Sequence, residues 1–153
     1  MSPVSFEDVK RFVTAALGDF EKYDHQLLEL CVDERAATHR LACHLQKHFS
    51  GWNADCEYNR KGRNPKELDG VLVRPDIIIH KRDSNDDNLL CIEAKKSGES
   101  IKKINADRKK LQGFTRSAGE YKYRFGLLII LSLTAPYKID CEWFEDGKSI
   151  EIC

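Results

Sequence analysis

Residues 74–96, RPDIIIHKRDSNDDNLLCIEAKK, combine two apolar runs with charged residues at defined ends. Pro75 and Asp76 stand at the head of the isoleucine run, where a strand tolerates proline and where aspartate marks an entry. Glu93 and Lys95 close the second run, and their spacing of two residues puts both side chains on one face of a strand. If the two runs form neighbouring strands, the three charged groups converge. Such a set can bind a divalent cation through oxygen and stabilise negative charge on a substrate.

Glu34 supplies a further carboxylate, which the periodicity of its helix directs toward the core. Its helical angle differs from those of Leu41 and Leu45 by only about 20°, because seven and eleven residues nearly complete whole turns. A buried, unpaired carboxylate costs roughly several kcal/mol, so we expect Glu34 to meet a metal ion or a basic side chain. The alternative is a favourable first-turn acid beside the helix dipole.

The elements that must position these groups follow from hydrophobic periodicity and turn signals. In chain order we expect a helix from Ser5 through Phe20, a helix over 34–49, a strand over 52–59, a loop over 60–68, strands over 71–80 and 89–95, a helix over 101–114, a strand over 125–133, and a hairpin of 139–144 with 150–153. The short connection between the second and third strands predicts an antiparallel pair. We therefore predict a single α/β (α+β) domain over residues 1–153, with a mixed sheet flanked by helices.

The composition describes a globular chain. Of its 153 residues, 41% are hydrophobic and 33% are charged, which excludes a disordered protein. The 25 basic and 25 acidic side chains give a net charge of zero. Any phosphate-binding surface must therefore be a local basic patch.

Cysteine usage and hydropathy bear on the compartment. The six cysteines stand singly, without a Cys-x-x-Cys pair, so neither a disulfide framework nor a structural zinc site is expected. The start MSPVSFEDVKRF lacks the apolar core of a signal peptide, and no apolar run reaches membrane-spanning length. We expect a cytoplasmic protein with no membrane partner.

Three histidines of the second helix, His39, His44 and His48, raise the alternative of a zinc site. His44 and His48 share a helical face, but no glutamate follows His44 as a zinc-protease motif requires. We interpret the three histidines as a polar helix face.

Glu34, the Pro75-Asp76 pair and Glu93-Ala94-Lys95 together resemble the PD-(D/E)xK nuclease superfamily, which has the restriction-endonuclease-like fold. The chain is also similar to small stand-alone bacterial proteins that carry the strings ERxxxHRLA, CEYNR, RPDIIIH and IEAKKS. The resemblance spans roughly residues 33–133 and implies a core order α-β-β-β-α-β within a mixed central sheet flanked by helices. The N-terminal helix and the C-terminal hairpin are then additions to this core.

The resemblance implies metal-dependent hydrolysis of phosphodiester bonds in nucleic acid, most directly DNA. The cofactor would be Mg²⁺, with Mn²⁺ as a substitute, because such an ion activates a water and offsets charge on the phosphate. Lys95 would orient that water and stabilise developing charge, whereas the alternative for Glu93 and Lys95 is a solvated strand end. The implied catalytic residues are Asp76, Glu93, Lys95 and Glu34. The implied metal ligands are Asp76, Glu93, Glu34 and the backbone carbonyl of Ala94.

Basic residues near these positions could contact the phosphate backbone of the substrate. The implied nucleic-acid-binding residues are Arg60, Lys61, Arg63, Arg74, Lys96 and Lys110. For Lys110, which lies in the expected helix over 101–114, a solvated helical face explains the charge equally well.

Three kinds of function are open on the sequence alone. The first is an active nuclease, expected to form a two-fold homodimer if its substrate is a duplex, because one domain carries one site. The second is a catalytically silent nucleic-acid-binding or assembly module on the same fold. The third is a subunit whose specificity comes from a partner protein, because 153 residues leave no room for a separate target-recognition domain.

Overall fold

The computed structural model describes the chain except residues 1–2, 31–33, 57–59, 62–63, 66, 69–70, 83, 85 and 133–135, and it gives the backbone alone at 28–29, 60–61, 64–65, 67 and 71–72. The elements are α1 (Phe6–Glu29), α2 (Glu34–His48), β1 (Asn53–Cys56), β2 (Arg60–Lys61), β3 (Asn64–Pro65), β4 (Glu67–Leu68), β5 (Val71–Leu72), β6 (Ile77–His80), β7 (Asn88–Lys96), α3 (Ile101–Thr115), β8 (Phe125–Leu131), β9 (Ile139–Glu145) and β10 (Lys148–Ile152).

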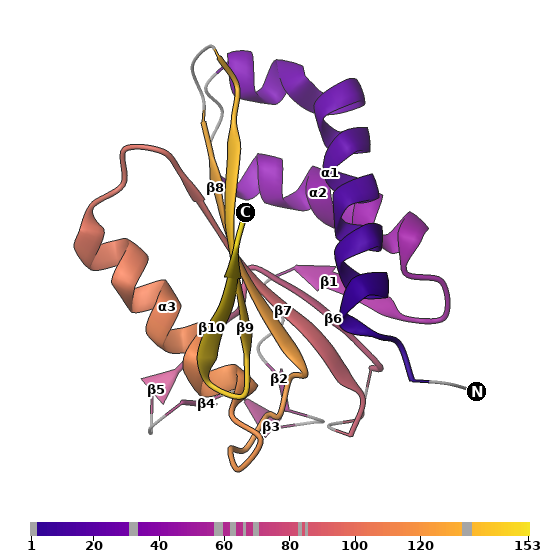
Figure 1. Cartoon of the computed structure of the whole chain (residues 1–153), viewed down its shortest axis with the longest axis vertical. Helices are drawn as coiled ribbons and strands as arrows, with labels where there is room; N and C mark the ends of the chain where they lie inside the picture. Colours follow the sequence, from indigo (N-terminus) through magenta and orange to yellow (C-terminus); the bar gives the residue numbers. More distant parts are fainter. Residues whose placement is uncertain are drawn as a thin grey trace.

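A six-stranded mixed sheet forms the centre of the fold, in the order β1-β6-β7-β8-β9-β10 (Figure 1). β7 and β8 run parallel, and the other neighbouring strands run antiparallel. A parallel pair needs a long crossover connection, and α3 provides it between β7 and β8. The predicted mixed α/β architecture is therefore confirmed.

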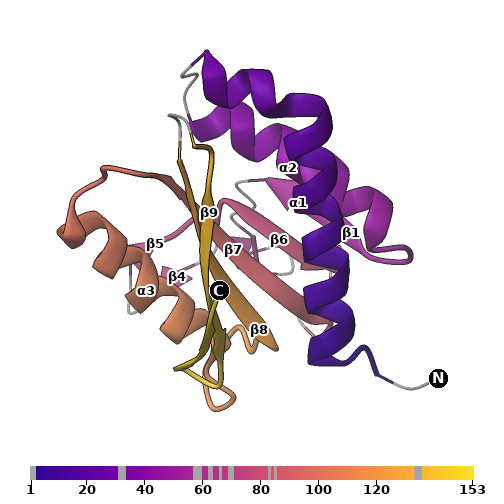
Figure 2. The same cartoon turned by 45° about the horizontal axis from the view of Figure 1, so that its top comes forward.

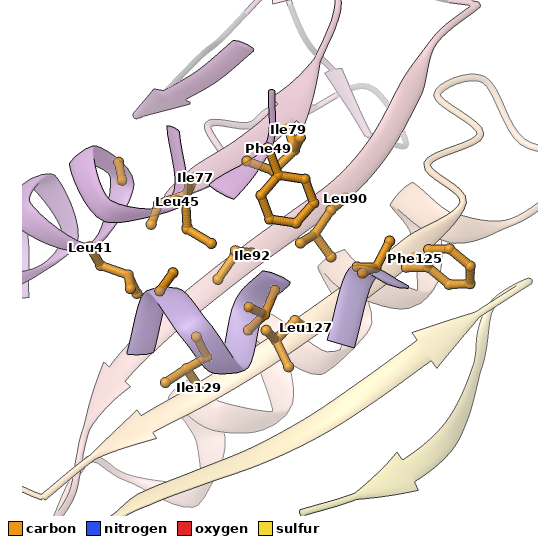
Figure 3. Packing of buried hydrophobic residues seen from close by; sticks show 14 of the residues in the cluster. Leu41, Leu45, Phe49, Ile77, Ile79, Leu90, Ile92, Phe125, Leu127 and Ile129 are labelled. Atoms are coloured by element: carbon orange, nitrogen blue, oxygen red, sulfur yellow. The ribbon is translucent and has the colours of Figure 1, made fainter. Parts of the chain in front are cut away.

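The helices lie on opposite faces of this sheet. Figures 1 and 2 show α1 and α2 together on one side and α3 on the other. Figure 3 shows Leu41 and Leu45 of α2 lying over the strand residues Ile77, Ile92 and Ile129, which belong to the larger apolar core. A smaller core fills the space between α3 and the opposite face of the sheet. No described helix combines the length and the hydropathy that crossing a membrane requires.

The first helix begins at the predicted position, through a reciprocal pair of hydrogen bonds. The backbone N–H of Asp8 donates to Oγ of Ser5 at 3.1 Å, and the backbone N–H of Ser5 donates to Oδ2 of Asp8 at 3.2 Å. This capping box satisfies two N–H groups that the first turn of a helix leaves without partners.

Two histidine–aspartate pairs join α1 to α2. Nε2 of His44 contacts Oδ2 of Asp24, and Nε2 of His48 lies 2.7 Å from Oδ2 of Asp19. His44 is 1% exposed, so its interpretation as part of a polar helix face is wrong. A polar ring between two packed helices needs a hydrogen-bonding partner, and Asp24 provides one. His39 is exposed, as expected.

The segment between β1 and β6 differs most from the expectation. The predicted loop over 60–68 contains short antiparallel ladders instead, β2 with β3 and β4 with β5. The predicted strand over 71–80 is divided, because β5 ends at Leu72 and β6 begins at Ile77, after a proline that has no N–H to donate. Of the predicted strand over 52–59, β1 is confirmed and residues 57–59 lie outside the described part.

Cys141 of β9 forms a disulfide bond with Cys153, the residue after β10, which the cysteine spacing had argued against. A β-bulge between Ser149 and Glu151 shifts the hairpin register by one residue. Cys153 rather than Ile152 therefore lies opposite Cys141, and the two cysteines exchange backbone hydrogen bonds of 3.2 and 2.9 Å. Stable disulfides are typical of oxidising compartments, so this pair removes the cysteine argument for a cytoplasmic location.

We expect the Cys141–Cys153 bond to stabilise the folded state by roughly 2–3 kcal/mol, because it restricts the conformations of the unfolded chain. Urea unfolding with and without dithiothreitol, repeated on Cys153→Ser, measures the effect. Cys43→Ser is the matched control, since Cys43 is a free thiol. Equal unfolding midpoints for oxidised and reduced wild-type protein would contradict this expectation.

Candidate functional site

The carboxylates of Asp76 and Glu34 complete the backbone pairing of β7. β6 pairs with β7 as far as Ile77 opposite Ile92, whereas β7 continues to Lys96. Beyond that point Asp76 Oδ2 accepts the N–H of Ala94 at 2.8 Å. Glu34 Oε2 likewise accepts the N–H of Lys96 at 2.9 Å. Both acids are thus held beside the end of β7 because two strand N–H groups need acceptors.

Glu93 and Lys95 lie on the face of β7 that α3 covers. Their spacing of two residues predicts that they share one face. Glu93 follows Cys91 on this face, which packs in the smaller core with Leu111 of α3. Glu93 is 1% exposed, and the Lys95 side chain is 19% exposed. Glu93 is therefore buried under a helix and Lys95 is half-buried beside it, so the pair is not a solvated strand end.

Asp107 on α3 belongs to the site, although the sequence analysis assigned it no catalytic or metal-binding role. It is 2% exposed and shares the buried stripe of α3 with Leu111 and Phe114. Residues four and seven positions apart lie on the same face of a helix. An aspartate on an otherwise apolar stripe was the signal that could have located it.

Two lysines pair with these acids. Lys95 Nζ lies 3.2 Å from Asp107 Oδ2 and 3.9 Å from Glu34 Oε1. Lys110 Nζ lies 3.2 Å from Asp107 Oδ1 and 3.9 Å from Glu93 Oε1. We call Glu34, Asp76, Glu93, Lys95, Asp107 and Lys110 the acid–lysine cluster. When all six side chains are ionised, four carboxylates against two ammonium groups leave a formal charge of −2, which one divalent cation would balance.

Burial strongly affects the ionisation of Glu93. Burial raises the pKa of its carboxyl group well above the ordinary value, and the negative charge of Asp76 raises that pKa further. The Lys110 ammonium acts in the opposite direction but does not reverse the shift. In metal-free protein, Glu93 therefore binds a proton more readily than an exposed glutamate does.

Lys95 is held as a cation. Burial alone would lower the pKa of Lys95, but the charges of Asp107 and Glu34 outweigh it and raise that pKa above the ordinary value. A lysine with a raised pKa keeps its proton at neutral pH. Its chemical use is therefore to stabilise negative charge rather than to accept a proton as a general base.

The carboxylate oxygens of Asp76 and Glu93 are suitable ligands for Mg²⁺, which usually binds through one or two carboxylates and keeps several waters. Glu93 Oε1 and Asp107 Oδ2 are buried and accept no hydrogen bond from the described residues, although Lys95 lies near Asp107. Among all the described residues, no group of three His, Cys, Asp or Glu side chains is arranged to hold a metal ion. Metal ligation by Asp76, Glu93, Glu34 and the carbonyl of Ala94 stays a prediction.

A cavity of about 1010 Å³ adjoins the cluster on the α2 side of β7. Its wall includes Glu34 and Asp76 from the cluster, together with Arg35, His39 and Lys96. The two carboxylates thus face a space large enough for part of a polymeric substrate, with basic groups on its wall.

The predicted phosphate contacts differ in where they lie. Lys110 joins the cluster, and Lys96 lines the cavity. Arg74 is exposed, two residues ahead of Asp76. Outside the described side chains lie Arg60, Lys61 and Arg63.

No protein-family model, no curated protein and no solved structure matches the chain. The structure establishes a mixed α/β arrangement, and the restriction-endonuclease-like fold stays a prediction.

We expect Glu93→Gln to stabilise the metal-free protein at neutral pH by roughly 1–3 kcal/mol, the scale of one uncompensated buried group. A carboxyl whose folded pKa is raised contributes stability below its unfolded pKa and loses it as pH rises through the folded pKa. The gain of the variant over wild type should therefore appear above about pH 4.5, the ordinary glutamate value, and grow toward neutrality.

Thermal unfolding in EDTA across this pH range measures the difference. Glu145→Gln is the control, because Glu145 is an exposed acid at the end of β9. A Glu93→Gln effect that is independent of pH, or that grows toward acid, would show that the buried carboxyl is not strained by its charge.

Proposed function

We propose that the protein is a metal-dependent nuclease that hydrolyses phosphodiester bonds in nucleic acid, most directly DNA. One observation carries the proposal. A nearly inaccessible carboxylate, Glu93, has an oxygen without a hydrogen-bond donor among the described residues and lies beside Asp76 and Lys110. The order α2, β1, β6, β7, α3, β8 also matches the α-β-β-β-α-β order of a restriction-endonuclease-like core, which supports that fold.

Asp76 and Glu93 would hold Mg²⁺ or Mn²⁺ at this site. When bound, such an ion lowers the pKa of a water and offsets charge on the phosphate. The protein's contribution is to place the acids before any ion arrives. Asp76 is fixed by the N–H of Ala94, and Glu93 by its place in a strand with neighbours on both sides. Preorganised ligands of this kind need little rearrangement when the ion binds.

Lys95 would stabilise the negative charge that develops on the phosphate during hydrolysis. Its ammonium group is positioned by Asp107 on one side and Glu34 on the other. A cation in a partly buried site acts more strongly on developing charge than one in water. Glu34 would then serve as a positioning residue for Lys95 as well as an acceptor for the backbone of β7.

The substrate would approach through the cavity beside α2, which meets the cluster at Asp76 and Glu34. Arg35 and Lys96 on its wall would contact phosphates. A chain with no net charge needs such local basic groups to attract a polyanion. We propose that duplex cleavage uses a two-fold homodimer, because each chain carries one cluster. The proposed function allows for a partner protein that supplies sequence specificity, and it involves no membrane.

A catalytically silent nucleic-acid-binding or assembly module is the second candidate. It is favoured by the structural use of the same carboxylates, because Asp76 and Glu34 each complete the pairing of β7. The lysines also neutralise part of the acidic charge without any metal. This candidate requires that the wild-type protein bind nucleic acid without cleaving it in Mg²⁺ or Mn²⁺.

The two candidates are separated by Lys95→Met, which removes the cation and keeps most of the aliphatic stem. We expect single-turnover cleavage of DNA in Mg²⁺ to slow by roughly 10²- to 10³-fold, the scale of losing one donor that stabilises transition-state charge. DNA affinity measured in Ca²⁺ should change much less, because many basic residues share the phosphate contacts.

Lys109→Met is the matched control, since Lys109 is an exposed lysine of α3 with the same charge. Both measurements should match wild type in that variant. If Lys95→Met weakens binding as much as it slows cleavage, Lys95 is an ordinary phosphate contact. If it changes neither, the nuclease assignment of the cluster is wrong.

A further inference from the structure

Lys110 of α3 lies beside the one Glu93 oxygen that has no hydrogen-bond donor in the described part of the chain. Its Nζ is 3.9 Å from Glu93 Oε1 and 3.2 Å from Asp107 Oδ1. A distance of 3.9 Å is too long for a hydrogen bond. Lys110 therefore offsets the charge of Glu93 without satisfying its oxygen.

We propose that Lys110 is a built-in counter-ion, paired with Glu93 in metal-free protein and released from it when a divalent cation binds. This inference rests on the proposed metal-dependent function. An ammonium group beside Glu93 and a divalent cation on the same carboxylate repel each other strongly in a poorly solvated site. Cation binding and the Lys110–Glu93 contact therefore exclude one another.

The charge of the cluster explains why the metal-free site needs this lysine. When all six side chains are ionised, their formal charge is −2. Without Lys110 the remaining five would carry −3, part of it on the buried Glu93. Like charges in a buried cluster destabilise the folded state when no cation compensates them. A divalent cation carries twice the charge of Lys110, so it can take over this compensation.

The ammonium group of Lys110 can move toward solvent when Glu93 binds a cation. Its side chain is 36% exposed, against 19% for Lys95, so it stands at the rim of the cluster. Asp107 Oδ1 remains its ion-pair partner at 3.2 Å. The flexible four-carbon stem of a lysine allows its ammonium group to move while it keeps one such partner. Lys95, held by Asp107 and Glu34, lacks this freedom.

Calorimetric titration with Mn²⁺ tests the exchange. In Lys110→Met, which keeps a stem of similar length without the charge, we expect the Kd for Mn²⁺ to fall about tenfold or more, because a competing cation is gone. Lys109→Met, at the neighbouring exposed position of α3, should stay close to wild type. Equal or weaker Mn²⁺ affinity in Lys110→Met would overturn the counter-ion role.

The same titration separates this inference from the function on which it rests. If neither wild type nor Lys110→Met binds Mn²⁺ at millimolar concentration, the metal-dependent function fails and the counter-ion role fails with it. If wild type binds Mn²⁺ and Lys110→Met binds it no more tightly, the counter-ion role alone fails.

A second measurement uses the wild-type protein and so does not depend on the folding of a variant. Acylation of lysines, located by mass spectrometry, should increase severalfold at Lys110 when Mg²⁺ is added and stay constant at Lys109. Unchanged acylation of Lys110 at a saturating Mg²⁺ concentration would overturn the proposal.

Discussion

The burial of one carboxylate, that of Glu93, is the constraint on which the site depends. A charge that is 1% exposed needs a proton or a nearby cation to be tolerated. The parallel β7–β8 pair requires a crossover helix, and this helix covers Glu93 while it brings Asp107 and Lys110 to it. The topology of the sheet and the charge of the site are thus linked. The same helix that excludes water from Glu93 also supplies the lysine that offsets its charge.

The unequal lengths of β6 and β7 determine where the other acids stand. β7 extends beyond the point where its pairing with β6 ends. The N–H groups of Ala94 and Lys96 therefore need acceptors that β6 does not supply. Asp76, just ahead of β6, and Glu34, at the start of α2, provide one oxygen each. The backbone pairing that completes the strand also fixes the direction of these carboxylates. A structural demand and the proposed chemistry are therefore met by the same groups.

The sequence predicted the parts of the site that depend on local pattern. Asp76 and the pair Glu93 and Lys95 were located from their positions at the ends of apolar runs, because period-two alternation fixes the face of a strand. Asp107 was missed as a member of the cluster because its role depends on how α3 docks on the sheet. His44 was misassigned because its burial depends on the packing of α1 against α2. The hairpin disulfide depends on a one-residue bulge, which no residue spacing reveals.

The central claim is that the acid–lysine cluster is a metal-dependent phosphodiesterase centre. The most direct test incubates purified wild-type protein and Glu93→Gln with linear, circular and single-stranded DNA, each with Mg²⁺, with Mn²⁺ or with EDTA. Cleavage by the wild type in Mg²⁺ or Mn²⁺, absent in EDTA and absent in Glu93→Gln, is the predicted result. Equal cleavage by Glu93→Gln, or no cleavage of any of these DNAs by the wild type, would contradict it.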